Sequence, residues 1–131
     1  MTIELTYLAW TLVLVLVQIA VTATFRTRET GVAYNAGPRD LPSPAPVGKI
    51  TGRLMRAQRN LFETLPVFIG AVLIAHLAKI HTAATHWGVL LYFWGRVLYA
   101  PLYAFGISYI RTVAWVGSLI GIIMLLESFL K

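Results

Sequence analysis

The chain has 131 residues, of which 58% are apolar and only 12% are charged, and its mean hydropathy is +0.73. This composition is typical of an integral membrane protein and not of a soluble domain. The net charge of +6 would suggest a nucleic-acid partner for a soluble protein, but the basic residues cluster around one connection, so we expect no such partner. Because it lacks cysteine, the chain has no disulfide, no thiol nucleophile and no thiolate metal ligand.

The first transmembrane helix is predicted over residues 5–25, an uncharged stretch that is long enough to cross a hydrocarbon core of roughly 30 Å. We expect a permanent span and no cleavable signal peptide, because Glu4 stands where a basic segment would be. Residues 26–51 contain Gly31, Gly37 and four prolines, which are Pro38, Pro42, Pro44 and Pro46. This composition favours turns and extended chain, so we predict a long loop.

Three further helices are predicted over residues 52–79, 82–105 and 111–129. His81 and His86, near the start of the third helix, are expected to be interfacial residues and not metal ligands, because no acidic ligand accompanies them. Gly117 and Gly121 form a GxxxG pair in the last helix, which is typical of close helix packing.

Four spans place both termini on one side of the membrane and the long loop on the other. The basic residues outside the spans, or at their ends, concentrate on the loop side: Arg26, Arg28, Arg39, Lys49, Arg53, Arg56 and Arg59. This distribution predicts that residues 26–51 are cytoplasmic. The sequence therefore predicts an all-α integral membrane protein, with a single domain over residues 1–131 folded as a four-helix transmembrane bundle.

The second helix carries a polar stripe. Arg56, Asn60 and Glu63 fall on one face at about 100° per residue, and Arg53 and Arg59 flank that face. Lipid does not accept such a stripe, so we expect it to face the interior of the bundle or a wet cavity.

A second stripe, with Tyr92, Arg96, Tyr99 and Tyr103, lies on the third helix, and Arg111 opens the fourth. A tyrosine stripe can be an interfacial belt or a packing seam as well as a site, and both readings stay open here. The topology brings both stripes to the cytoplasmic half, where several arginines meet a single acid, Glu63. Because buried guanidinium groups need anions, we expect an anionic ligand. A small zwitterionic peptide with two carboxylates fits these groups, and glutathione has that charge pattern and supplies the thiol that the chain lacks.

One segment of the second helix reads Arg56-Ala57-Gln58-Arg59-Asn60, with Glu63 and Pro66 after it. It closely resembles the signature of the MAPEG family, the membrane-associated proteins of eicosanoid and glutathione metabolism, and Arg96, Tyr99, Tyr103 and Arg111 give a second match. The resemblance implies a homotrimer that binds glutathione between neighbouring subunits near the cytoplasmic face. It also implies a lipophilic second substrate from the bilayer. The short chain is similar to bacterial members, which suggests the bacterial inner membrane.

The resemblance also assigns roles by position. The glutathione-holding residues would be Arg56, Asn60 and Glu63, with Arg59 as an accessory, and Arg96, Tyr99 and Tyr103 on the third helix. Arg111 resembles the family's catalytic arginine, which stabilises the glutathione thiolate. Its role would be electrostatic, because an arginine stays protonated and cannot act as a general base. Glutathione would be a co-substrate, and no metal is expected.

Three functions remain open at this point. The first is a glutathione-dependent transferase or peroxidase that acts on lipophilic electrophiles. The second is a non-catalytic lipid-binding or scaffold protein, as in the lipoxygenase-activating branch of the family. The third is a small proton-coupled efflux protein, which needs an acid buried in mid-span, and the first predicted helix has none. We favour the first, because an unused buried charge cluster is costly.

Overall fold

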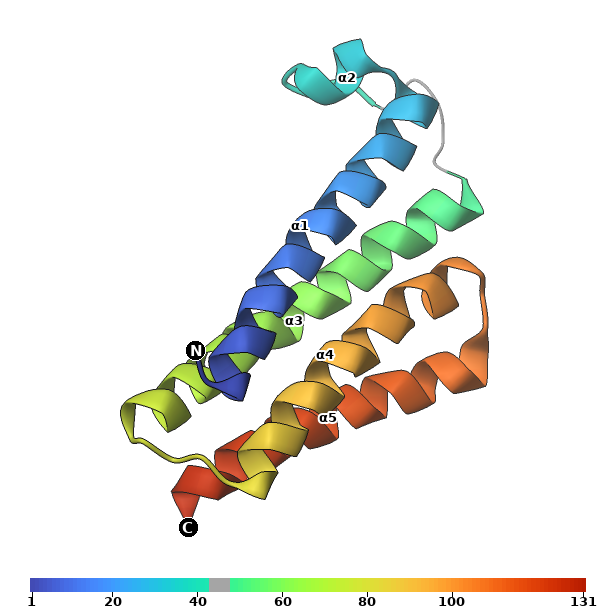
Figure 1. Cartoon of the computed structure of the whole chain (residues 1–131). Coiled ribbons are helices and arrows are strands. Elements are labelled where there is room, and N and C mark those ends of the chain that lie inside the picture. Colours follow the sequence, from blue (N-terminus) through green and yellow to red (C-terminus); the bar gives the residue numbers. More distant parts are fainter. Residues whose placement is uncertain (43–47) are drawn as a thin grey trace.

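Four long helices run alongside one another in alternating directions in the computed structural model, which describes residues 1–42 and 48–131 (Figure 1). They are α1 (Ile3–Thr30), α3 (Lys49–Leu77), α4 (Ala83–Ala104) and α5 (Ser108–Leu130), and a short helix, α2 (Val32–Ala36), follows α1. Both termini lie at the end of the bundle opposite α2. The predicted all-α four-helix bundle is confirmed.

The helix ends differ from the sequence prediction on the loop side. Helix α1 continues to Thr30, residues 32–36 form the short helix α2, and α3 already begins at Lys49. The prediction of a loop over residues 26–51 was therefore wrong for these three segments. The charged residues after Phe25 can continue a helix once it has left the hydrocarbon core, and the helix stops where Gly31 adopts φ +90°. Pro38 and Pro42 are not helical, and Pro44 and Pro46 lie outside the described residues.

Three of the long helices, α1, α3 and α5, are long and apolar enough to cross a membrane. Helix α4 has 22 residues, but its sequence includes Arg96 and three tyrosines, and it is not among these three. It packs against α1, α3 and α5, so its polar residues can be kept from lipid by protein contacts. The composition and the helices together show an integral membrane protein.

Close packing of α4 against α5 depends on glycine. A Cβ atom at Gly121 would lie 2.5 Å from the carbonyl oxygen of Gly88, and one at Gly95 would lie 2.8 Å from the carbonyl oxygen of Ala114. The expected role of Gly121 in close packing therefore holds, but its counterpart is Gly88 on α4. Gly117, the other member of the GxxxG pair, has open space beside it.

This difference predicts opposite outcomes for two identical substitutions. Gly121→Ala should lower the free energy of unfolding by about 1–3 kcal/mol, because backbone atoms must move to admit the methyl group. Gly117→Ala should be neutral or stabilising by up to about 1 kcal/mol, because alanine is the better helix former. Denaturant titration in detergent micelles measures both, and equal stability of the two variants would contradict the packing argument.

Candidate functional site

The polar stripe of α3 meets α4 through two arginines. Arg56 is exposed at the surface of α3, and its Nε donates a hydrogen bond to the Oη of Tyr103 at 3.0 Å. Its guanidinium carbon also lies 5.7 Å from the centre of that ring, close enough for a cation–π contact. One nitrogen of Arg56 is thus held by α4, and the remaining two can meet a ligand.

Arg96 lies inside the helix bundle, with only 2% of its surface exposed. Its Nη2 donates to the Asn60 main-chain oxygen at 2.8 Å, to Asn60 Oδ1 at 2.7 Å and to Thr64 Oγ1 at 3.1 Å. The ring centre of Tyr99 lies 5.0 Å from its guanidinium carbon. The expected meeting of the α3 and α4 stripes is therefore observed at this residue.

Arg111 lies in the first turn of α5, which begins at Ser108 and not at residue 111 as predicted. Its guanidinium carbon is 4.5 Å from the ring centre of Tyr103. A hollow of about 330 Å³ opens beside it, lined by Asn60, Tyr99, Tyr103, Arg111, Thr112 and Trp115. Thr112 and Trp115 were not among the predicted site residues, although Trp115 stands one helical turn after Arg111.

The structure divides the predicted residues into three groups. Asn60, Tyr99, Tyr103 and Arg111 line the hollow; Arg56 and Arg96 adjoin it through hydrogen bonds to Tyr103 and Asn60. Arg59 and Glu63 are exposed and lie outside it, and Arg59 lines a different hollow of about 250 Å³ between α1 and α3. The residues of the α3 stripe therefore lie on two different surfaces of the chain.

Among the residues that the structure describes, no acid forms an ion pair with the arginines at this site. In the described part of the chain, every ion pair involves Glu4 or Glu127, and none involves an arginine. Nε and Nη1 of Arg96 are buried and have no hydrogen-bond partner there. A buried cation without a counter-ion is unfavourable, so the site is suited to an anionic ligand.

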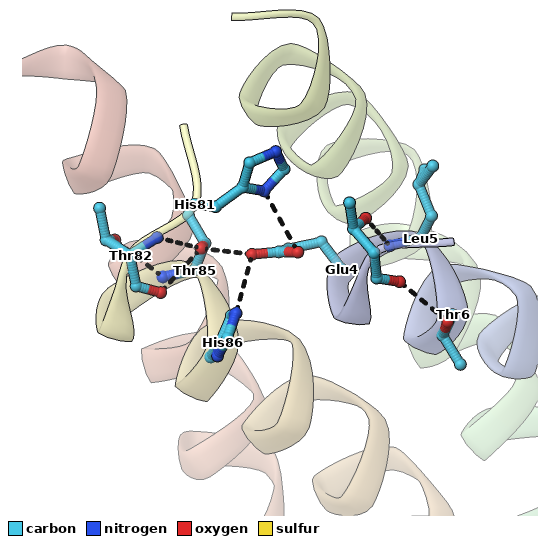
Figure 2. Close-up of polar contacts among 8 residues, drawn as sticks. Glu4, Leu5, Thr6, His81, Thr82, Thr85 and His86 are labelled. Carbon is cyan, nitrogen blue, oxygen red and sulfur yellow. Dashed lines mark hydrogen bonds and ion pairs between the residues drawn. The ribbon is translucent and has the colours of Figure 1, made fainter. Parts of the chain in front are cut away.

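A second polar cluster lies at the opposite end of the bundle, where Figure 2 shows Glu4 of α1 between His81 and His86. The Glu4 side chain is 1% exposed, and it accepts a hydrogen bond from Thr85 Oγ1 at 2.6 Å. Its Oε2 lies 3.4 Å from His81 Nδ1, and its Oε1 lies 3.6 Å from His86 Nε2.

The expectation that these histidines have no acidic neighbour was wrong, because α1 begins at Ile3 and brings Glu4 into the bundle. For the same reason the first helix does contain an acid, although in its first turn and not in mid-span. Among residues 1–42 and 48–131, no three histidine or acidic side chains are grouped so that they could hold a metal ion.

Removal of this carboxylate should destabilise the protein. Glu4→Ala is expected to cost about 1.5–3 kcal/mol of unfolding free energy, the range for a hydrogen bond to a charged group. Glu127→Ala is the control, because Glu127 pairs with Lys131 at the surface and its loss should cost less than about 0.5 kcal/mol. Denaturant titration that gives equal losses for the two variants would show that Glu4 does not join α1 to α4.

The comparison with known protein families gave a match that covers nearly the whole chain. A family model described as the MAPEG family matches residues 5–130, which include both polar stripes and Arg111. Comparisons with curated proteins and with solved structures gave no match. Since the family match extends over nearly all of the sequence, the protein belongs to the MAPEG family, whose members include glutathione transferases and related proteins.

Proposed function

We propose that the protein is a glutathione-dependent transferase or peroxidase that acts on lipophilic electrophiles entering from the bilayer. The observation that supports this most strongly is the hollow beside Arg111, where Arg56, Arg96 and Arg111 gather without a carboxylate within ion-pair distance in the described residues. Glutathione brings two carboxylates, an ammonium group and a thiol, and family membership is consistent with this ligand.

Each group of the ligand has a partner of matching chemistry. The free nitrogens of Arg56 suit bidentate binding of a carboxylate, and the Asn60 amide and the Tyr99 hydroxyl suit peptide groups. Glu63 would hold the ammonium group, with Arg59 as an accessory. Both residues are exposed in the single chain, so we propose that a neighbouring subunit of a homotrimer covers them and completes the site.

Arg111 would make the thiol reactive. Lowering the pKa of a thiol from about 8.5 by two units needs roughly 2.7 kcal/mol of selective thiolate stabilisation. One guanidinium in a site with few waters can supply this amount, because Coulomb energies rise as the local dielectric falls. The ring of Tyr103 limits the directions open to the Arg111 side chain, which favours one placement of the charge.

The basic residues of α1 and α3 favour an orientation with residues 26–51 in the cytoplasm. The similarity of the short chain to bacterial members of the family favours the bacterial inner membrane as its location. Glutathione would then reach the site from the cytoplasm, and the electrophile would reach it from lipid. In this arrangement the two substrates approach the Arg111 hollow from different phases.

A second candidate is a non-catalytic lipid-binding protein. A hollow of about 380 Å³ between α1, α3 and α4 favours it, because most of its lining is apolar: Leu14, Val17, Val21, Phe25, Ile50, Leu54, Val97, Ala100, Pro101, Ala104 and Phe105, with Gln18 as the polar exception. An acyl chain would fit such a lining.

Two measurements on the purified protein in detergent test the proposed function. Titration calorimetry should detect glutathione binding, and an aryl halide should be conjugated to glutathione faster than in buffer alone. A protein that binds no glutathione and conjugates no electrophile, yet carries a co-purified lipid seen by mass spectrometry, would support the second candidate and contradict the first.

A further inference from the structure

A chain of hydrogen bonds runs behind the Arg111 hollow and ends at Asn60. Tyr92 is fully buried, with its ring stacked on Phe68 at 4.0 Å between ring centres, and its Oη lies 2.9 Å from Thr64 Oγ1. Thr64 Oγ1 in turn lies 3.1 Å from Arg96 Nη2, which also binds Asn60. Neither Thr64 nor Tyr92 lines the hollow.

The hydroxyl oxygen of Thr64 has three hydrogen-bond partners: the main-chain oxygen of Leu61 at 3.3 Å, Tyr92 Oη at 2.9 Å and Arg96 Nη2 at 3.1 Å. Arginine has no acceptor, so Arg96 donates to Thr64. Either hydroxyl can be the donor in the pair of Thr64 and Tyr92, and in both cases the buried Tyr92 hydroxyl holds Thr64 in place.

The same rule fixes the amide of Asn60. Since Arg96 can only donate, the Asn60 atom 2.7 Å from Nη2 must be the oxygen Oδ1. The Nδ2 group makes no hydrogen bond within residues 1–42 and 48–131, and Asn60 lines the hollow. Asn60 therefore has its Nδ2 donor available to a ligand there.

We infer that Thr64 and Tyr92 are positioning residues: they hold Arg96 in one place and thereby fix Asn60 with its Nδ2 group available to a carboxylate or peptide oxygen of the ligand. The inference rests on the proposed function, with glutathione as the ligand. It assigns the two hydroxyl groups an effect on glutathione affinity and none on the ionisation of the thiol, which depends on Arg111.

Glutathione affinity of five proteins tests this: wild type, Thr64→Val, Thr64→Ser, Asn60→Ala and the double variant Thr64→Val/Asn60→Ala. Valine keeps the shape of threonine without its hydroxyl, so Thr64→Val should raise Kd about tenfold, whereas Thr64→Ser should bind like wild type. Because Thr64 acts through Asn60, the double variant should bind no more weakly than Asn60→Ala alone. At saturation, the ultraviolet thiolate band of bound glutathione should be the same in Thr64→Val as in wild type.

Tyr92→Phe, which retains the stacked ring, should weaken binding in the same direction as Thr64→Val. A loss in Thr64→Val that serine does not repair, or that multiplies with the loss in Asn60→Ala, would overturn the inference while leaving the proposed function in place. A wild-type protein without glutathione affinity would overturn both.

Discussion

Replacing Arg111 by alanine should lower the thiolate fraction of bound glutathione at pH 7 from about three quarters to about 3%, and should lower the conjugation rate about 25-fold. The factor follows from a thiol pKa that returns from about 6.5 to about 8.5 when roughly 2.7 kcal/mol of thiolate stabilisation is lost. Arg111 is suited to this role because it lines the hollow from the first turn of α5, and α5 has no side-chain cap at its N-terminus. The uncapped main-chain N–H groups of α5 add positive electrostatic potential at the N-terminal end of the helix, where Arg111 lies.

The pH dependence gives this prediction a distinctive form. Without Arg111, the thiol of bound glutathione should ionise at its ordinary pKa of about 8.5, so the variant's rate should rise as the pH is raised from 7 to 9. In the wild type the thiol is already ionised at pH 7, so its rate should be nearly flat over that range. Ultraviolet difference spectra and the pH–rate profile measure the two effects separately.

Arg28→Ala is a suitable control, because Arg28 is an exposed cation in the last turn of α1 and does not line the Arg111 hollow. It removes the same charge from the protein and should leave the thiolate band unchanged. Retention of the thiolate band in Arg111→Ala, or its loss in Arg28→Ala, would show that Arg111 does not act locally on the sulfur.

The sequence predicted the four long helices and the meeting of the two polar stripes, because both follow from periodicity and from the exclusion of charge from lipid. It could not predict that Asn60 lines the Arg111 hollow while Glu63, on the same stripe of α3, lies outside it. Asn60 and Glu63 are separated by only about 60° around an ideal helix. Whether such a separation puts both residues in one hollow depends on how α3 is rotated against α4, and that rotation is set by packing.

The contacts of Glu4 could not be predicted from the sequence either. A carboxylate in the first turn of a helix is ordinarily favourable beside the helix N-terminus and gives no sign of a distant partner. Its contacts with His81, Thr85 and His86 join parts of the chain that are about 80 residues apart, as the hydrogen bond to Thr85 shows. Only the folded bundle brings these groups together.

Arg56→Ala should weaken glutathione binding about 100-fold and leave the thiolate fraction at saturation unchanged, the converse of the result for Arg111. A charge-assisted hydrogen bond to a carboxylate is worth about 1.5–3 kcal/mol, so the loss of two such bonds, partly replaced by water, accounts for an effect of this size. Because Arg56 is exposed, the loss of its hydrogen bond and ring contact with Tyr103 should lower the free energy of unfolding by only about 0.5–1.5 kcal/mol. Titration calorimetry measures the affinity, and denaturant titration measures the stability.

Arg56→Lys separates charge from geometry. Tyr103 accepts from the Nε of Arg56 and so orients the other two nitrogens of the planar guanidinium as a fork, whereas a lysine ammonium is a point charge with no such fork. If Arg56 binds a carboxylate through that fork, Arg56→Lys should recover less than half of the binding free energy lost in Arg56→Ala. If Arg56 only neutralises charge, lysine should restore the affinity. Tyr103→Phe should then have no effect on binding, because the orientation of the guanidinium would not matter.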